Sequence, residues 1–253
     1  MTAGCANKIA LVTGGASGIG RASALALARA GAAIMVADLD LAGCDETAQL
    51  ITAAGGSART QQVDVADEAS VTALVDATVS AFGRLDLAFN NAGIAGQVAR
   101  TSDYPSDDWH RVIAVNLTGV WYCMKYELRQ MLAQGGGAIV NTASIAGLIG
   151  MRGAPAYCAA KHGVVGLTKN AALEYAKANI RINAVCPGGV RTNMTESADR
   201  EHPGLLDRLA KLEPMGRLAE PEEIASAVVW LCSDGASFMT GHALAVDGGF
   251  VAR

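Results

Sequence analysis

Short apolar segments alternate with segments of helical character along the chain. The apolar segments predict strands at residues 8–13, 33–37, 58–63, 85–89, 138–140, 180–185 and 242–246. The segments between them predict helices at 41–54, 67–82, 109–132, 155–178 and 221–232, besides an Ala/Leu-rich helix that ends near residue 30. Strands that alternate with helices in this way form a doubly wound sheet with right-handed crossovers. The sequence therefore predicts an α/β fold with a mostly parallel, seven-stranded sheet flanked by helices.

A glycine-rich turn follows the first predicted strand and leads into the first helix. A strand, a glycine turn and a helix N-terminus together bind a pyrophosphate through backbone N–H groups. Here Gly14 permits the tight turn, Gly18 lets the backbone approach a phosphate, and Gly20 lets the helix pack on the strand. The spacing is G-x-x-x-G-x-G, and a glycine motif alone often marks an ordinary turn. The flanking strand and helix favour a nucleotide site.

Asp38 ends the second predicted strand. An acid about 20 residues after the glycine turn is the expected partner of the adenosine ribose hydroxyls. The alternative is a helix cap or a surface carboxylate, and the position after an apolar strand favours the ribose. Recognition of the extra phosphate of NADP needs a nearby Arg or Lys. The best-placed positions hold Gly15, Ala16 and Leu39, and Arg21 lies past the turn, so the sequence predicts NAD as the cofactor.

Residues 139–161 carry the chemistry of a carbonyl/alcohol pair. Tyr157 and Lys161 are four residues apart, so on a helix they share one face. A free phenol has a pKa of about 10, and a nearby ammonium lowers it towards neutrality. Ser144, just after the preceding strand, adds a hydroxyl to the same point. The alternative for the pair alone is a half-buried Tyr beside a solvated Lys. With a nicotinamide site present, an acid–base site is favoured.

Length and composition exclude several other classes. A chain of 253 residues suits one α/β domain, and its net charge of −4 gives no reason to expect nucleic acid or an anionic membrane as partner. The first eight residues do not resemble a signal peptide, and no apolar run approaches membrane-spanning length. Six scattered cysteines without a C-x-x-C pair indicate free thiols. We therefore expect a cytoplasmic protein that binds no metal.

In order and spacing, these motifs resemble the short-chain dehydrogenase/reductase family over essentially the full length. The residues that carry the resemblance are Thr13, Gly14, Gly18 and Gly20, Asp64, Asn90 to Gly93, Asn116, Ser144, Tyr157 and Lys161, Pro187, Gly188 and Thr192, and Val246 to Gly249. The resemblance implies a Rossmann-type fold. It also implies a single NAD(P)-binding domain over residues 1–253, with the charged segment 190–220 as a lid over the substrate.

The resemblance also implies a role for each site residue. Tyr157 is the general acid/base, Lys161 lowers its pKa and binds the nicotinamide ribose, Ser144 binds the substrate oxygen, and Asn116 holds a water that links Lys161 to solvent. The residues implied to bind the cofactor are Gly14, Ser17, Gly18, Ile19, Gly20, Asp38, Asp64, Val65, Asn91, Ala92, Gly93, Tyr157, Lys161, Pro187, Gly188, Val190 and Thr192. Those expected to contact the substrate are Ser144, Ile145, Tyr157, Met151, Gly189 and Met194.

The expected function is hydride transfer between NAD(H) and a secondary alcohol or ketone. A pocket lining without charge favours a neutral substrate. Within the same family, a 3-oxoacyl-thioester reductase, a sugar dehydrogenase and a dihydrodiol dehydrogenase stay open, and a non-catalytic nucleotide-sensing protein is an alternative of another class. The helix that starts at Trp109 carries apolar residues beyond the needs of one sheet face, and the family pairs such helices between subunits. We therefore expect a homotetramer. The apolar residues in question are Val112, Val115, Val120, Trp121 and Met124.

Overall fold

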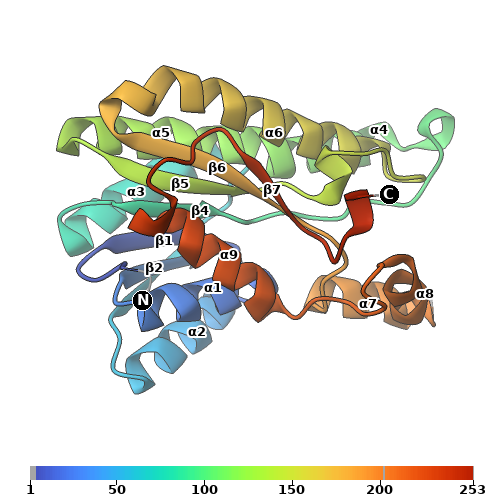
Figure 1. Cartoon of the computed structure of the whole chain (residues 1–253), viewed down its shortest axis with the longest axis horizontal. Coiled ribbons are helices and arrows are strands. Elements are labelled where there is room, and N and C mark those ends of the chain that lie inside the picture. Colours follow the sequence, from blue (N-terminus) through green and yellow to red (C-terminus); the bar gives the residue numbers. More distant parts are fainter. Residues whose placement is uncertain (1–3, 202, 253) are drawn as a thin grey trace.

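The computed structural model describes residues 4–201 and 203–252, and all seven predicted strands form within them (Figure 1). Residues 1–3 of the N-terminal segment, residue 202 of the predicted lid and residue 253 lie outside the described residues. The strands are β1 (Ile9–Thr13), β2 (Ala33–Asp38), β3 (Ala58–Gln62), β4 (Leu87–Asn90), β5 (Gly137–Thr142), β6 (Ile180–Pro187) and β7 (Ala243–Val246). Each lies within two residues of its predicted place.

The strands form one parallel sheet in the order β3-β2-β1-β4-β5-β6-β7. The chain builds outwards from β1 to β3, then crosses back and builds outwards again from β4 to β7. The switch point therefore lies between β1 and β4, where open α/β sheets bind ligands beyond the carboxyl ends of their strands. The predicted fold class is confirmed.

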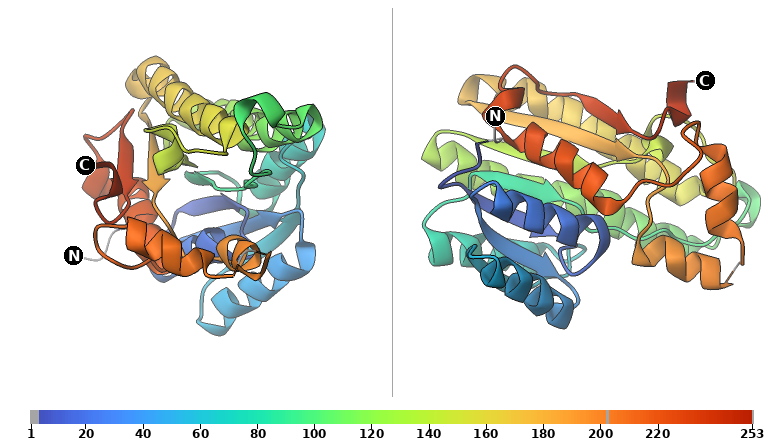
Figure 2. Two further views of the ribbon diagram at one scale, coloured as in Figure 1. Left: turned by 90° about the vertical axis from the view of Figure 1, so that its right-hand side faces the viewer. Right: turned by 60° about the horizontal axis from the view of Figure 1, so that its bottom comes forward.

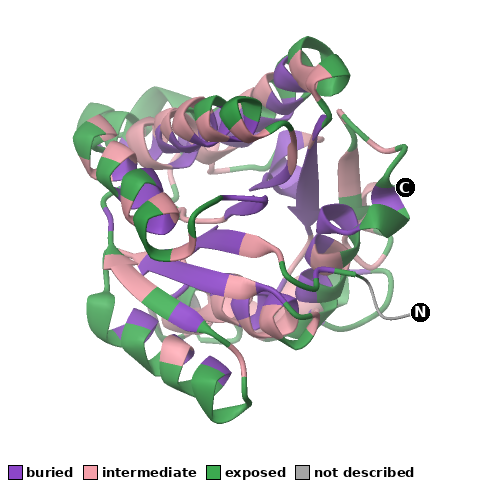
Figure 3. Ribbon diagram, turned by 90° about the vertical axis from the view of Figure 1, so that its left-hand side faces the viewer, coloured by how far each residue is buried: buried purple, intermediate pink, exposed green. Residues whose placement is uncertain are grey.

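Helices cover both faces of the sheet (Figures 1 and 2). One layer comprises α1 (Gly18–Arg29), α2 (Leu41–Ala53) and α9 (Pro221–Cys232), and the other comprises α3 (Glu68–Phe82), α4 (Ser106–Ile113), α5 (Gly119–Gln134) and α6 (Pro155–Tyr175). Each layer buries its own apolar cluster against the strands, so the buried residues concentrate in the centre of Figure 3. Two short helices, α7 (Asn193–Glu201) and α8 (Leu205–Leu212), lie beyond the carboxyl edge of the sheet.

Residues 109–132 are helical throughout, as predicted, but they do not form one regular α-helix. α4 and α5 are separated by a π-helical turn at Ala114–Thr118, where the Gly119 N–H donates to the Ala114 carbonyl. Asn116 lies in this turn and is fully buried. Both of its side-chain polar atoms bond the backbone of Ile94. We infer that these contacts offset the poor helix propensity of Asn and favour the wider turn.

We expected this helix to carry more apolar residues than one face of the sheet can bury. Most of those residues lie in the core. Val112, Val120 and Met124 are each at most 3% exposed, whereas Trp121 is 44% exposed. The reason is that the helix packs on both the sheet and α3, so it has more than one face to bury. Only Trp121 of these residues offers a large surface to a partner subunit.

A buried polar network lies beneath the carboxyl ends of β4 and β5. Asn90 Nδ2 donates to Glu127 Oε2 at 2.9 Å and to Asn141 Oδ1 at 3.0 Å, and Asn141 Nδ2 donates to Thr168 Oγ1 at 2.9 Å. Glu127 is fully buried, and its Oε1 atom has no hydrogen-bond partner among the described residues. Burial raises the pKa of Glu127 to about 7, against the opposing hydrogen bond from Asn90. The core thus contains a carboxyl group that changes charge near neutral pH.

We expect Glu127 to make the protein less stable as the pH rises. Its pKa is about 7 in the folded chain and near its ordinary value of 4.5 when unfolded, so the folded state binds the extra proton between these values. The free energy of unfolding then falls as the pH rises through this window, by up to about 3 kcal/mol. Glu127→Gln keeps the shape without the charge, and urea unfolding at fixed protein concentration is expected to show a flatter pH dependence.

The matched control for this prediction is Glu174→Gln. Glu174 lies on the exposed face of α6, bonded to Asn170. The Glu174→Gln substitution is expected to leave the pH dependence of the free energy of unfolding unchanged. If the stability of Glu127→Gln falls with rising pH as steeply as that of the unmodified protein, another group must titrate.

The cysteines are free thiols, as predicted. Five of them are buried in the core: Cys5, Cys44, Cys123, Cys186 and Cys232. Burial raises the pKa of each of these five thiols. Only Cys158, at the start of α6, is partly exposed. Among the described residues, no helix is both long and apolar enough to cross a membrane, and no group of acidic, His and Cys side chains could hold a metal ion.

Candidate active site

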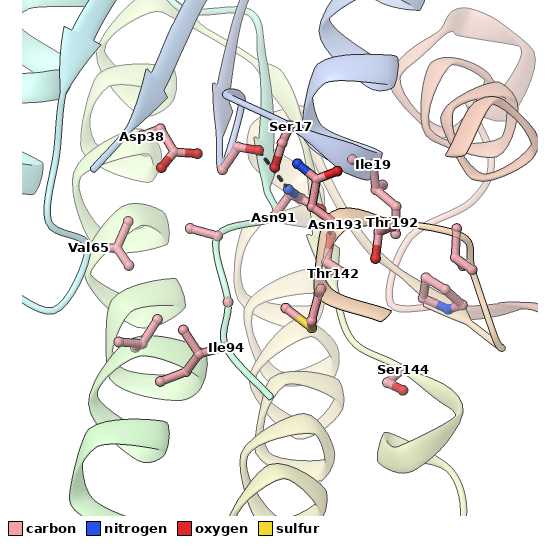
Figure 4. Close-up of a pocket in the computed structure, with 18 of the residues that line it drawn as sticks. Ser17, Ile19, Asp38, Val65, Asn91, Ile94, Thr142, Ser144, Thr192 and Asn193 are labelled. Atoms are coloured by element: carbon pink, nitrogen blue, oxygen red, sulfur yellow. Dashed lines mark hydrogen bonds between the residues drawn. The ribbon is translucent and has the colours of Figure 1, made fainter. Parts of the chain in front are cut away.

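A cavity of about 480 Å³ opens at the carboxyl edge of the sheet, across the switch point between β1 and β4. Figure 4 shows Asp38 towards one end of it and Ser144 towards the other. Its wall comes from the turns after the first six strands, from the π-helical turn, and from the first turns of α6 and α7. Parallel strands bring these turns to one edge, so motifs far apart in the sequence meet here.

The glycine turn has the backbone that the sequence predicts. Gly14 and Gly18 have φ of +66° and +51°, a region that side chains other than Gly rarely adopt. A Cβ at Gly20 would overlap the Gly14 carbonyl oxygen, so this position permits close helix–strand packing. Ser17 occupies the N-cap of α1 without making a capping hydrogen bond. The N-terminus of α1 therefore presents backbone N–H groups and a hydroxyl to an anion in the cavity.

Asp38 lies at the end of the cavity wall beside this turn. Its Oδ2 accepts from the Ala16 N–H at 3.2 Å and its Oδ1 from the Asp40 N–H at 3.1 Å. Arg21 is engaged elsewhere, with Thr47 and Glu46 at 2.9 and 2.8 Å. Asp38 and Asp64 are therefore the only charges at this end of the cavity among the described residues. This end of the cavity therefore presents carboxylate acceptors to a ligand.

Tyr157 and Lys161 project from the first turns of α6 towards Ser144, which follows β5. The Lys161 Nζ donates to the Thr142 carbonyl at 2.7 Å and lies 5.5 Å from the centre of the Tyr157 ring. The side chains of Ser144 and Tyr157 are hydrogen-bonded, and Ser144 Oγ also accepts from the Ala146 N–H at 3.1 Å. Phenol, ammonium and hydroxyl therefore converge on one end of the cavity.

Burial dominates the titration of both α6 residues. It raises the pKa of Tyr157 above the ordinary value of a phenol, while the hydrogen bond with Ser144 acts in the opposite direction. It lowers the pKa of Lys161 to about 8. Desolvation of the phenolate is the largest of these effects, so the net shift of the Tyr157 pKa is upward.

Asn116 lies outside the cavity wall. Its Oδ1 accepts from the Ile94 N–H at 2.8 Å, and its Nδ2 donates to the Ile94 carbonyl at 2.7 Å. Ile94 is itself part of the wall. A Cβ added at Gly93 would lie 3.1 Å from Asn116 Oδ1 and 3.7 Å from Lys161 Nζ, so this glycine keeps a narrow gap between them. The side chain of Asn116 thus holds the wall beside Lys161.

The cavity wall contains most of the residues predicted for the site. Five predicted residues lie elsewhere: Gly20 beneath the turn, the buried Asn116 and Ile145, the exposed Met151, and Gly189 just behind the wall. The wall also includes residues that sequence analysis did not assign to it, namely Leu39, Val63, Ile94, Val115, Thr142, Ala143, Asn193 and Thr195. Most of these are immediate neighbours of predicted residues, and that adjacency is the signal that could have found them.

The chain is similar to known proteins over nearly its whole length. A family model described as enoyl-(acyl carrier protein) reductase matches residues 14–251. Cyclohexanol dehydrogenase of Acinetobacter sp. (strain SE19) is 48% identical over 247 residues, covering 98% of this chain and 96% of that protein. The 2,5-dichloro-2,5-cyclohexadiene-1,4-diol dehydrogenase of Sphingobium indicum is 46% identical and covers 97% of each chain.

Solved structures resemble the whole fold as well. Levodione reductase has a TM-score of 0.95 at 39% identity, covering 98% of this chain and 99% of that one. A putative 2-deoxy-D-gluconate 3-dehydrogenase from Agrobacterium tumefaciens, solved with bound NADP, has a TM-score of 0.90 at 37% identity, covering 99% and 98%. These proteins share the arrangement of strands and helices around the cavity.

Proposed function

Since the chain belongs to the short-chain dehydrogenase/reductase family, in which it is an oxidoreductase of secondary alcohols and ketones that uses a nicotinamide cofactor, we propose that its substrates are uncharged six-membered carbocyclic alcohols. The two relatives described above carry such a ring in the names of their substrates. Among the described residues of the cavity wall, the Ser144 end carries one charged side chain, that of Lys161. This single charge is the observation that carries the proposal.

The wall around that end also carries apolar side chains. They include Ile94, Ala143, Val190 and Met194, beside hydroxyl groups such as those of Ser144 and Tyr157. Apolar side chains favour a hydrocarbon ring by removing its surface from water. A carboxylate or phosphate on the ring would have to be desolvated there without a dedicated Arg partner. We therefore assign recognition of the ring to the apolar wall and recognition of its hydroxyl to the polar pair.

We assign the proton transfer to Tyr157. Ser144 holds the substrate oxygen beside the phenol, and Lys161 supplies positive charge that favours the phenolate when the alcohol gives up its proton. The nicotinamide ring, when bound, accepts the hydride from the alcohol carbon or returns it to the ketone. The remaining contribution of the chain is orientation, from the glycine turn, Asp38 and the turn after β6.

We propose NAD rather than NADP as the preferred cofactor. The support is the carboxylate of Asp38 at the adenosine end, beside which the described part of the cavity wall has no basic side chain. The Agrobacterium relative was solved with bound NADP, so membership of the family does not by itself select NAD. The choice in this chain therefore depends on its own residues around Asp38.

A panel of substrates tests the proposed function. Purified protein is incubated with NAD and cyclohexanol, with a linear secondary alcohol, a sugar and a 4-hydroxycyclohexanecarboxylate as comparisons, and the absorbance of the reduced nicotinamide is followed. We expect the highest kcat/KM with the uncharged ring. Preference for a sugar or a 3-oxoacyl thioester would contradict the proposal. No turnover with any member, despite cofactor binding, would favour the nucleotide-sensing alternative.

We also propose a homotetramer of 222 symmetry in the cytoplasm. Large apolar side chains are exposed on two parts of the surface: Trp121 and Leu173 on α5 and α6, and Phe238 on the loop between α9 and β7. Two separate apolar surfaces are what two kinds of two-fold contact need. Light scattering is expected to give the mass of four chains. A monomer at micromolar concentration would contradict this.

A further inference from the structure

The lid, residues 190–220, leaves and rejoins the body of the protein at one narrow base. There the Ala219 N–H donates to the Gly189 carbonyl and the Arg191 N–H donates to the Ala219 carbonyl, each at 2.9 Å. Val190 and Ala219 form an isolated parallel bridge between the two backbone segments. Figures 1 and 2 show α7 and α8 projecting from the sheet edge beyond this base. The base therefore controls where the lid lies.

Glu213 is the buried carboxylate at this base. It follows α8 directly and is 6% exposed, and its Oε1 accepts from the Gly189 N–H at 2.7 Å. A buried carboxylate needs hydrogen-bond donors, and such charge-assisted bonds are short and strong. The bond thus joins the end of the lid to the turn after β6, whose Pro187 and Gly188 line the cavity.

Gly188 and Gly189, the two glycines of that turn, pack closely against the Glu213 carboxylate. A Cβ at Gly188 or at Gly189 would lie 3.0 Å from Glu213 Oε1. The Cβ at Gly188 would also meet the Asp247 Cα at 2.9 Å, and the Cβ at Gly189 the Leu218 side chain at 2.7 Å. The carboxylate is therefore fitted against the backbone of the cofactor turn on both sides.

The outer part of the lid has little packing that could fix its position. Its large apolar side chains Met194, Leu212 and Met215 are 45%, 49% and 64% exposed. A hydrogen bond of 3.0 Å from the Leu206 N–H to Asp199 joins α7 and α8 to each other. The two helices of the lid are thus linked to each other, and Glu213 links the end of α8 to the base.

Resting on the proposed function, we propose that Glu213 is a positioning residue that couples the lid to the cofactor turn. Its carboxylate holds the Gly188–Gly189 backbone against the cofactor and at the same time fixes the end of α8 at the base of the lid, whose α7 contributes Asn193 and Met194 to the cavity wall. Loss of the acceptor is expected to loosen both parts together. Binding of the cofactor and closure over the alcohol then depend on one shared contact.

The test compares Glu213→Ala, which removes the acceptor, with Glu213→Gln, which keeps a carbonyl oxygen for the Gly189 N–H. The matched control is Glu220→Gln, a carboxylate at the same base whose side chain is 55% exposed and pairs with Arg191 at 3.5 Å. NADH binding is measured by fluorescence titration. Lid mobility is measured by tryptic cleavage at Arg208 and Lys211 without cofactor, and kcat and KM are measured with cyclohexanol.

We expect Glu213→Ala to weaken NADH binding by about tenfold, to raise KM more than it lowers kcat, and to speed cleavage of the lid. Glu213→Gln and Glu220→Gln are expected to stay close to the unmodified protein. Unchanged NADH binding and unchanged cleavage in Glu213→Ala would overturn the proposal. A Glu213→Gln protein with the same defects as Glu213→Ala would also overturn it. If no cyclic alcohol is oxidised, the proposed substrate class is wrong. NADH binding and tryptic cleavage then still decide the role of Glu213.

Discussion

Replacing Tyr157 with Phe is expected to lower kcat for alcohol oxidation by roughly 10²- to 10⁴-fold, the usual contribution of a general acid–base group. The substitution keeps the ring on α6 and removes only the hydroxyl that is hydrogen-bonded to Ser144. Lys161 keeps its bond to the Thr142 carbonyl. The dissociation constant for NADH, measured by fluorescence titration, is therefore expected to change little.

Tyr175→Phe is the matched control, because Tyr175 ends the same helix and packs on the core away from the cavity. It is expected to leave kcat unchanged. Near-normal turnover in Tyr157→Phe would remove this phenol from the mechanism. In the unmodified protein, oxidation needs the phenolate, and burial raises the pKa of Tyr157. Oxidation is therefore expected to quicken with rising pH on the alkaline side of neutrality, and ketone reduction to slow.

Changing Asp38 to Ala together with Leu39 to Arg is expected to narrow or reverse the preference for NAD over NADP. In the unmodified protein we expect that preference to be about 10²-fold or more in kcat/KM, since the carboxylate would face the 2′-phosphate and like charges at an interface cost several kcal/mol. Leu39 is 65% exposed at the cavity wall, so an Arg there can reach the phosphate. Kinetics with both cofactors at saturating alcohol measure the ratio.

Asp40→Asn is the control for general loss of negative charge near the site. Asp40 lies two residues from Asp38, outside the cavity wall, and caps α2 by accepting from the Gly43 N–H. Asn keeps the cap, so the cofactor ratio is expected to stay the same. Equal rates with NAD and NADP in the unmodified protein, or a ratio untouched by the double change, would show that another residue selects the cofactor.

Local sequence patterns, namely apolar segments and turn motifs, predicted the fold and most of the cavity wall. Each strand ends in its own turn motif, and parallel pairing then forces those turns to one edge, so Asp38 and Tyr157 come to the same cavity without any long-range information. What the sequence could not supply is how the chain packs outside the motifs. One example is the π-helical turn that contains Asn116, whose side chain bonds Ile94, 22 residues away.

Sequence analysis missed two of the buried carboxylates, Glu127 and Glu213, for different reasons. Glu127 lies at helical spacing from Val120, Met124 and Met131, all buried, so its position on the apolar stripe of α5 was a readable signal. Glu213 sits in a charged, irregular segment where nothing in the pattern separates a buried carboxylate from a solvated one. The raised pKa of Tyr157 depends on the density of the surrounding protein, which residue spacing does not reveal.

The distribution of thiols makes this protein a convenient object for site-selective labelling. Maleimide-type reagents attack the thiolate, and the five core cysteines are both inaccessible and protonated at neutral pH because burial raises their pKa. Cys158 is the one partly exposed sulfur, in the residue next to Tyr157. A fluorophore or spin label can thus be attached at a single point beside the catalytic end of the cavity, without first mutating away the other cysteines.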